Sequence, residues 1–244
     1  MKKIDKDFCL CYNGGKPTMG VTMLNRGLIV SCQAGVGEPL HGDNIMHLMA
    51  KAAVAGGACG IRALYYDVKA IKATVSVPVI GLVKEDYEDS EIYITPTKRE
   101  IDLVLETGAD CIALDATGRV RPGGETLAEL VAYAKERAPE VELMADIATL
   151  EDAITADALG FDYVSTTLRG YTKQTAGAVL PDLDFAAEVS KVLKKAKLIV
   201  EGGIFEAREM ERVSTINPYA VVVGSAITRP QVITARFNAA LKLK

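Results

Sequence analysis

The amino-acid sequence predicts an α/β protein that forms a single (β/α)8 TIM barrel of the phosphate-binding type. Three observations favour this fold. Short runs rich in Val, Ile, Leu and Ala alternate eight times with amphipathic stretches from residue 28 onward. Long links follow the predicted strands, and polar side chains recur where these strands end. The chain has 244 residues, and one such barrel typically has about 250.

Eight segments have the composition of parallel strands covered on both faces, since most are nearly continuous in apolar residues. Amphipathic stretches between them, in which apolar residues recur every three or four positions, include 44–55, 127–136 and 206–213. A doubly wound open sheet is the alternative fold, disfavoured because the eight units are similar and no dinucleotide-binding glycine motif occurs. We predict strands at residues 28–33, 59–63, 77–84, 111–117, 142–149, 163–168, 197–203 and 220–227.

The connections differ between the two ends of the predicted barrel. Helix-to-strand links are short and often begin with a glycine suited to a helix end, as at 56–58. Strand-to-helix links are longer, notably 85–97, 118–125 and 169–182. The long loops therefore gather at the C-terminal ends of the strands, where barrel enzymes hold their active sites.

The composition limits the classes of ligand and partner. Hydrophobic residues make up 49% of the chain and charged residues 25%, and no apolar run reaches the roughly 18 residues of a membrane span. The net charge of −4 argues against binding to nucleic acid, whose phosphate backbone attracts basic surfaces. We therefore expect a small ligand, with no nucleic-acid or membrane partner.

Cysteine usage favours a reduced, cytoplasmic protein. The five cysteines are odd in number and form no paired Cys-x-x-Cys motif. Cys32, Cys59 and Cys111 lie in apolar strand-like runs, so we expect buried, inert thiols. Residues 1–22 have neither helical periodicity nor the apolar run of a signal peptide. We interpret residues 1–25 as an N-terminal extension, with Met23 as an alternative start, and residues 26–244 as the barrel domain.

Polar side chains stand at the ends of seven of the eight predicted strands, where an apolar run would otherwise simply stop. One such residue is most simply a solvated strand end. Seven of them indicate a shared cavity, because the strand ends of a barrel converge at its mouth. The residues are Gln33, Arg62, Lys84, Asp115, Asp146, the pair Thr166 and Thr167, and Glu201.

Two groups of small residues predict a phosphate site. Gly202 and Gly203 end the seventh predicted strand, and Gly224 and Ser225 lie in the eighth, at the positions where many barrels hold phosphate on backbone N–H groups. Arg229 follows closely and could add a cationic contact. The alternative is that these glycines only relieve turns.

Lys84 and Glu201 are the predicted acid–base pair. Partial desolvation at a barrel mouth disfavours the ammonium form of a lysine and brings its pKa toward a working range. The alternative is a structural ion pair between the two residues. The two histidines, His41 and His47, have no metal-binding spacing, so we expect no metal and no cofactor.

The same residues lie in motifs that resemble the bacterial N-acetylmannosamine-6-phosphate 2-epimerases of sialic acid catabolism. The resemblance runs from about residue 26 to the C-terminus and includes GLIVSCQ (27–33), GIRA (60–63), VPVIGLVKEDY (77–87), ADCIALDAT (109–117), LMADIAT (143–149), TTLRGYT (166–172), VEGGI (200–204) and VVGSAITRP (222–230). It implies this barrel fold, conversion of N-acetylmannosamine 6-phosphate to N-acetylglucosamine 6-phosphate without metal or nicotinamide, and a homodimer.

The resemblance also implies roles for individual residues. Lys84 and Glu201 would be the catalytic pair. Gln33, Arg62 and Asp146 would hold the sugar or its N-acetyl group, and Gly202, Gly203, Gly224, Ser225 and Arg229 would surround the phosphate. The chain departs from the family pattern at Gly203, where a larger and often basic residue is common, at Arg169, where serine is usual, and at Ser165, where glycine is common. Arg169 could supply the cation that Gly203 lacks.

The predicted reaction inverts carbon 2 through an enediolate, because the carbon 2 proton is acidic only when the sugar ring opens to an aldehyde. Lys84 and Glu201 would exchange that proton, and donors such as Gln33, Arg62 or protonated Lys84 would stabilise the oxyanion. The alternatives are another phosphate-binding barrel isomerase, an aldolase with a Schiff base on Lys84, and a non-catalytic sugar-phosphate sensor.

Overall fold

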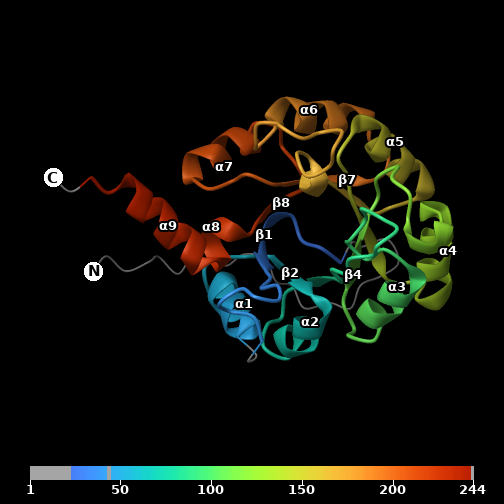
Figure 1. Cartoon of the computed structure of the whole chain (residues 1–244), viewed down its shortest axis with the longest axis horizontal. Coiled ribbons are helices and arrows are strands. Elements are labelled where there is room, and N and C mark those ends of the chain that lie inside the picture. Colours follow the sequence, from blue (N-terminus) through green and yellow to red (C-terminus); the bar gives the residue numbers. More distant parts are fainter. Residues whose placement is uncertain (1–22, 43–44, 243–244) are drawn as a thin grey trace.

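The computed structural model of the chain describes residues 23–42 and 45–242. It confirms the predicted (β/α)8 barrel: eight parallel strands pair in chain order, and the first strand pairs with the last to close the sheet. Figure 1 looks down the barrel, with the helices arranged in a ring around the strands. The strands are β1 (Gly27–Cys32), β2 (Gly60–Leu64), β3 (Val79–Leu82), β4 (Cys111–Asp115), β5 (Glu142–Asp146), β6 (Tyr163–Ser165), β7 (Lys197–Glu201) and β8 (Ala220–Val223).

The helices cover the outside of the barrel. Alternate strand residues point inward to the barrel interior and outward to the helices, so Ile29 belongs to the interior cluster and Val30 to an outer one. The helices are α1 (Met46–Ala55), α2 (Tyr65–Lys72), α3 (Lys98–Leu105), α4 (Leu127–Arg137), α5 (Leu150–Leu159), α6 (Leu183–Val192), α7 (Ala207–Ser214), α8 (Ser225–Thr228) and α9 (Pro230–Ala240), with short 3-10 helices at Pro122–Gly124 and Thr166–Leu168.

Seven of the eight strands end earlier than predicted. Val83 and Ile147 lie beyond the ends of β3 and β5 but remain 2% and 0% exposed. Apolar residues therefore continue past the last strand pairing, which is why composition overestimates strand length. After β6 the backbone turns into the 3-10 helix at Thr166–Leu168, and after β8 it turns into α8. The helix predicted at 206–213 begins one residue later because Glu206 caps it, in a capping box with Glu209.

The N-terminal end of the barrel is closed by the segment that precedes β1. Leu24 is 1% exposed and packs in the barrel interior. Its N–H group donates to the carboxylate of Glu142, which also accepts from the Tyr163 hydroxyl at 2.8 Å. The barrel unit thus includes Leu24, two residues before the boundary at residue 26 that the sequence suggested. The rest of the predicted extension, residues 1–22, lies outside the described residues.

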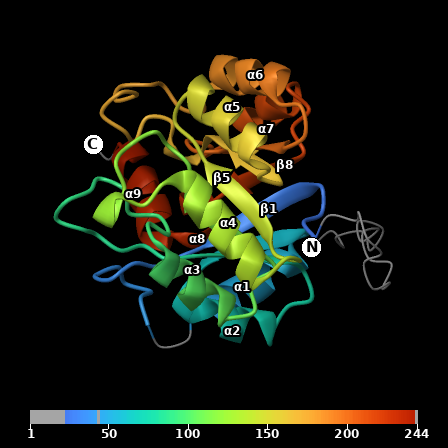
Figure 2. The same ribbon diagram turned by 90° about the vertical axis from the view of Figure 1, so that its right-hand side faces the viewer.

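The opposite end of the barrel holds the long loops. Figure 2 shows the loops that follow β3, β4 and β6 gathered at one end of the molecule, as the sequence predicted. Cys32, Cys59 and Cys111 are buried and not disulfide-bonded, also as predicted, and burial raises the pKa of the Cys32 thiol to about 12. None of the helices in the described part of the chain is long and apolar enough to cross a membrane.

Helix α9 differs from the other helices of comparable length because it buries none of its residues. It projects away from the ring of helices toward the C-terminus in Figure 1. Its apolar side chains are correspondingly open: Phe237 is 75% exposed, and Leu241, which follows the helix, is 60% exposed. The eighth helical position of the barrel therefore leaves an uncovered apolar face.

Candidate active site

A polar cavity of about 230 Å³ opens at the C-terminal ends of the strands. Residues from β1, β2, β7 and β8, and from the loops after β3, β6 and β7, meet in it. Nine of the ten predicted site residues line this cavity, so the structure brings them together. They are Gln33, Arg62, Lys84, Glu201, Gly202, Gly203, Gly224, Ser225 and Arg229.

Asp146 is the tenth predicted residue, and it does not line the cavity. Its side chain is fully buried at the end of β5, where it forms a bidentate pair with Arg62 at 2.9 Å (Nη1 to Oδ1) and 2.6 Å (Nη2 to Oδ2). Arg62 is itself 1% exposed. Asp146 therefore orients the guanidinium from beneath the cavity floor, in the planar two-bond arrangement typical of such pairs.

Arg62 also reaches the second carboxylate of the site. Its Nη1 lies 3.3 Å from Oε2 of Glu201, so one guanidinium holds two acidic side chains from different strands. Burial alone would lower the pKa of Arg62, but Asp146 and Glu201 more than offset it and raise that pKa. The buried Nε of Arg62 has no hydrogen-bond partner among the described residues. Arg62 is thus a permanent cation in the cavity floor.

The two predicted acid–base groups have pKa values shifted toward each other. Burial, followed by repulsion from Arg62 and Arg229, lowers the pKa of Lys84. Burial raises the pKa of Glu201, and Asp146 adds to this, while Arg62, Thr167 and Lys84 oppose it. An amine that loses its proton more easily and a carboxyl that keeps it longer are suited to exchanging protons near neutral pH.

Lys84 and Glu201 do not form the ion pair that was the structural alternative for them. Within the described chain, the ion pair of Glu201 is made with Arg62, and Lys84 has none within 4.0 Å. Lys84 stands two residues beyond β3, and Glu201 ends β7. Because these strands are four apart in a closed ring of eight, the two side chains approach the cavity from opposite sides.

The predicted phosphate side of the cavity combines the backbone of glycine residues with one cationic side chain. Gly202 and Gly203 have φ values of 111° and 72°, a region that favours glycine, and Gly224 precedes the first turn of α8. The guanidinium of Arg229 reaches this side and is paired, through Nη2, with Oε1 of Glu38 at 2.8 Å. Glu38 comes from the loop between β1 and α1.

The departure at Gly203 has a local structural explanation. A Cβ at this position would lie 2.3 Å from the Cβ of Leu180 and 2.7 Å from its carbonyl carbon. The loop between β6 and α6 thus occupies the space that a larger side chain would need. Arg169, which could have replaced a cation lost at Gly203, does not line the cavity. It pairs with Asp182 at 2.9 Å and lies over the ring of Phe185.

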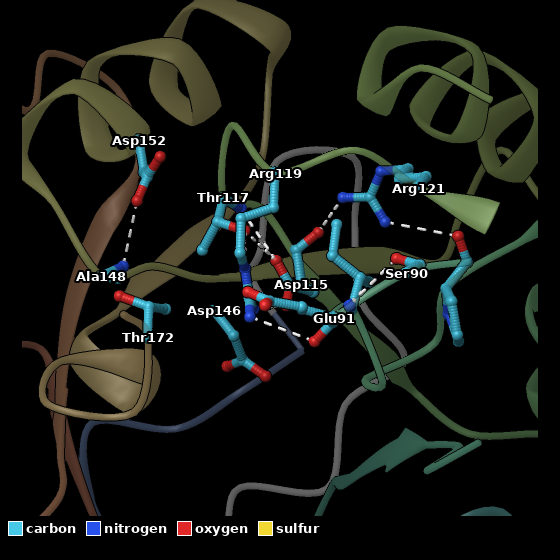
Figure 3. Close-up of polar contacts among 12 residues, drawn as sticks. Ser90, Glu91, Asp115, Thr117, Arg119, Arg121, Asp146, Ala148, Asp152 and Thr172 are labelled. Carbon is cyan, nitrogen blue, oxygen red and sulfur yellow. Dashed lines mark hydrogen bonds and ion pairs between the residues drawn. The ribbon is translucent and has the colours of Figure 1, made fainter. Parts of the chain in front are cut away.

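Asp115 was expected at the shared cavity, but it faces a separate cluster. Figure 3 shows it beside the side chain of Arg119, whose Nη2 lies 2.6 Å from its Oδ2. The Thr117 hydroxyl donates to Oδ1 of Asp115, and Arg119 also donates to the carbonyl of Glu91 in the loop after β3. A cavity of about 730 Å³ lies beside this cluster, between the loops after β3, β4, β5 and β6. The cluster ties the end of β4 and the loop after it to the loop after β3.

Some residues that line or border the cavity were not predicted as site residues. The Thr167 hydroxyl lies within hydrogen-bond distance of both Asp146 and Glu201, and Thr167 was noted only as a polar strand end. Tyr93 and Tyr171 lie in long loops, where the sequence has no periodic signal, and Glu38 comes from the loop after β1. No group of three or more His, Cys, Asp or Glu side chains in the described residues is arranged to hold a metal ion.

Comparison with known proteins gives consistent matches. Residues 46–243 match the family described as "Putative N-acetylmannosamine-6-phosphate epimerase". A protein of Staphylococcus carnosus named "Putative N-acetylmannosamine-6-phosphate 2-epimerase" is 54% identical over 223 residues, which cover 90% of this chain and 99% of that protein. One of the same name from Staphylococcus haemolyticus is 52% identical over 225 residues, covering 91% and 100%.

A solved structure matches over nearly the whole length. It is the N-acetylmannosamine-6-phosphate 2-epimerase from Clostridium perfringens, with a TM-score of 0.87 and 44% identity. The match covers 93% of this chain and all of that one.

Proposed function

The chain belongs to the family of N-acetylmannosamine-6-phosphate epimerases, and we propose that its barrel mouth interconverts N-acetylmannosamine 6-phosphate and N-acetylglucosamine 6-phosphate. The substrate is a phosphorylated amino sugar, as in the named relatives, and the reaction belongs to sialic acid catabolism. Inversion at carbon 2 requires a proton to leave one face of that carbon and a proton to arrive on the other. The enzyme must therefore hold acid–base groups around an open-chain sugar and stabilise an enediolate.

Lys84 and Glu201 are the proposed acid–base pair. One removes the carbon 2 proton and the other returns a proton to the opposite face, so the two exchange roles between the forward and the reverse reaction. Their approach from opposite sides of the cavity supports this division, because each faces a different side of a ligand held between them. Arg62, a cation in the floor, stabilises the negative oxygen of the enediolate.

The remaining predicted residues position the substrate. Gln33 donates its amide Nε2 to the Ser31 hydroxyl, and no described residue donates to its carbonyl oxygen, which is thus available to a sugar hydroxyl or amide N–H. Gly202, Gly203, Gly224 and Ser225 line the phosphate side, and Arg229 supplies the charge there. Asp146 acts on the sugar through Arg62 rather than by touching it. Phosphate binding at one end holds carbon 2 at the other.

The observation that carries this proposal is the placement of Lys84 and Glu201 in one cavity with Arg62 between their strands. We propose incubation of N-acetylmannosamine 6-phosphate with the enzyme in D₂O, followed by NMR at carbon 2. With two bases, deuterium appears in the product after one turnover, while unreacted substrate stays protonated. No exchange and no second epimer would exclude the function, and equal labelling of both epimers from the start would indicate a single base.

Two variants test the pair directly. Lys84→Met and Glu201→Gln remove the proton-carrying groups with little change in volume, so we expect each to lower kcat by at least 10²-fold. The matched controls are Lys51→Met on α1 and Glu188→Gln on α6, which are exposed and outside the cavity. Activity of Lys84→Met within threefold of these controls would remove Lys84 from the mechanism. Covalent trapping of Lys84 by borohydride with substrate would indicate the aldolase chemistry instead.

We further propose that the protein is a homodimer in which a second copy covers α9. The support is the apolar face described above: α9 buries no residue, and a cavity of about 440 Å³ between α9 and the loop after β7 is lined by Phe205, Ile233 and Phe237. Exposed apolar patches of this kind mark association sites. Light scattering after gel filtration would show a dimer for the wild-type chain and a monomer for Phe237→Glu. Lys191→Glu on α6 is the control and should remain a dimer. A Phe237→Glu variant that is still a dimer would show that the interface lies elsewhere.

The proposed substrate also supports the predicted cytoplasmic location. A sugar phosphate carries its charge permanently, and charged groups cross bilayers poorly, so such metabolites stay in the compartment where they are made. Immunoblotting of cytoplasmic and membrane fractions against the native protein checks this. Recovery with the membranes would contradict it.

A further inference from the structure

The hydroxyl of Thr167 lies between the two carboxylates of the site. Its Oγ1 is 2.7 Å from Oδ1 of Asp146 and 3.0 Å from Oε2 of Glu201. It is also 2.8 Å from the hydroxyl of Ser165, which is fully buried. A hydroxyl has one proton to donate and two lone pairs to accept with, so Thr167 serves only one of the two carboxylates at a time.

Asp146 depends less on a hydrogen bond from the Thr167 hydroxyl than Glu201 does. Both oxygens of Asp146 already accept from Arg62, at 2.9 and 2.6 Å. Glu201 has one longer contact with Arg62, at 3.3 Å. Ser165 Oγ, at 2.8 Å, is a third acceptor within reach of the Thr167 hydroxyl, but it is neutral, and an ionised carboxylate is the stronger acceptor. The ionised Glu201 is therefore the preferred acceptor.

The contacts of Glu201 also distinguish its two oxygens. Arg62 and Thr167 both contact Oε2, whereas no described residue bonds to Oε1. Because Glu201 lines the cavity, Oε1 is the oxygen that faces a ligand. The neighbouring Thr166 fixes the backbone of the same residue: its Oγ1 accepts from the Glu201 N–H at 3.0 Å and donates to the Glu201 carbonyl at 2.8 Å.

We propose that Thr167 is a positioning residue that holds Oε2 of Glu201 and thereby presents Oε1 as the oxygen that exchanges the carbon 2 proton. When Glu201 takes this proton on Oε1, the Thr167 hydroxyl turns to Oδ1 of Asp146 and keeps its own proton. When Glu201 gives the proton up, the hydroxyl turns back to Oε2. On the Glu201 side of the substrate, the proton therefore passes between carbon 2 and Glu201 while Thr167 keeps its own proton, and the Thr167 hydroxyl changes partner with the charge of Glu201. This inference rests on the proposed epimerase function.

The raised pKa of Glu201 supports the argument, because Thr167 is among the groups that oppose the rise. Without the hydroxyl, Glu201 would be protonated at still higher pH. A variant without it should therefore lose activity on the acid side of the pH profile earlier than the wild type. A purely structural role in packing would not produce this displacement.

The test compares Thr167→Val, which keeps the shape and removes the hydroxyl, with Thr167→Ser, which keeps the hydroxyl. We expect Thr167→Val to lower kcat about 10- to 100-fold with KM within threefold, and to move the acid limb of the kcat profile to higher pH. Thr167→Ser should retain kcat within about fivefold. Thr155→Val, at an exposed threonine of α5, is the matched control.

A double-mutant cycle separates positioning from packing. In a Glu201→Gln background, Thr167→Val should lower the rate of carbon 2 exchange by less than a further threefold, because the carboxylate that Thr167 positions is already absent. Equal losses in both backgrounds, or a Thr167→Val enzyme as active as Thr155→Val, would overturn the proposal. If Thr167→Val does not fold, Thr167→Ala enters the same cycle. A wild-type enzyme that neither labels carbon 2 in D₂O nor forms the second epimer would instead overturn the proposed function, which keeps the two failures distinct.

Discussion

The guanidinium of Arg229 is paired with the carboxylate of Glu38, with Nη2 and Oε1 2.8 Å apart. The side chain of Gln231 and the N–H group of Gly35 also contact Glu38, at 3.4 and 3.3 Å. The only cation of the proposed phosphate side within the described residues thus already has an anionic partner from the loop after β1. An arriving phosphate must compete with Glu38 for Arg229.

We predict that Glu38→Gln binds inorganic phosphate about fivefold more tightly than the wild type. The neutral amide competes less well for Arg229 and repels the incoming anion less. Isothermal titration with phosphate measures the change directly. Arg229→Met should weaken phosphate binding at least tenfold, and in that background Glu38→Gln should have little further effect. Weaker phosphate binding by Glu38→Gln alone would show that Glu38 orients Arg229 instead.

The pKa shifts of Lys84 and Glu201 predict that kcat/KM stays high over a narrower pH range than it would with the pKa values of free lysine and glutamate side chains. The active pair holds one exchangeable proton. Because burial raises the pKa of Glu201, the pair takes up a second proton at a higher pH than an ordinary glutamate would. Because burial, Arg62 and Arg229 lower the pKa of Lys84, the pair loses its last proton at a lower pH than an ordinary lysine would. Activity therefore falls on both sides within these limits.

The measurement is kcat/KM across the pH range at constant ionic strength. The substrate phosphate titrates near pH 6, so its own ionisation is measured by ³¹P NMR and removed from the acid limb. Lys51→Met provides the control profile, which should superimpose on that of the wild type. An alkaline limb at or above the value of a free lysine would mean that Lys84 is not the titrating group.

Much of the cavity could be predicted because its residues interrupt apolar strands. Lys84 and Glu201 end runs of Val, Ile and Leu, where a charged residue has no packing role. Asp115 and Asp146 have the same sequence context, yet neither lines the cavity: Arg119 covers one and Arg62 the other. A strand-end carboxylate that faces a ligand and one that supports an arginine look the same in sequence.

The contacts between loops could not be predicted, because they join residues far apart in the chain. Glu38 and Arg229 are separated by 191 positions, and the β1 to α1 loop has no periodicity that would place it beside the last strand. Thr167 lies 34 positions from Glu201, and its position in a Thr-Thr pair gives no sign of which hydroxyl faces the cavity. The hydrophobic pattern determines strand order, whereas rim contacts depend on the path of each loop.

A substitution at Gly203 tests how closely the loop between β6 and α6 packs against this residue. A Cβ there would lie 2.3 Å from Leu180, and its φ of 72° already disfavours other residues. We predict that Gly203→Ala lowers the free energy of unfolding by about 2–4 kcal/mol, the sum of a left-handed backbone and an overpacked contact. Gly177→Ala, at φ 88° with nothing within 4 Å of the new Cβ, is the matched control and should cost about 1 kcal/mol. Urea unfolding of both variants measures the difference. Equal losses would mean that Leu180 moves aside freely.

Arg119 joins the end of β4 to the loop after β3, which contains Lys84. We predict that Arg119→Ala destabilises the protein by about 2 kcal/mol, because the fully buried Asp115 loses the cation that offsets the cost of burying its carboxylate. The backbone of the 85–95 segment also loses a donor at the Glu91 carbonyl. Its amides should therefore exchange faster in hydrogen–deuterium exchange mass spectrometry, while those of α6 stay unchanged.

The control is Arg208→Ala, which breaks an exposed pair with Glu206 and should lower the free energy of unfolding by about 0–1 kcal/mol. Unchanged exchange at 85–95 in Arg119→Ala would show that the other contacts of this loop, among them the Lys84 to Ile94 bridge and the Ser90 hydrogen bond to Val120, hold it without Arg119.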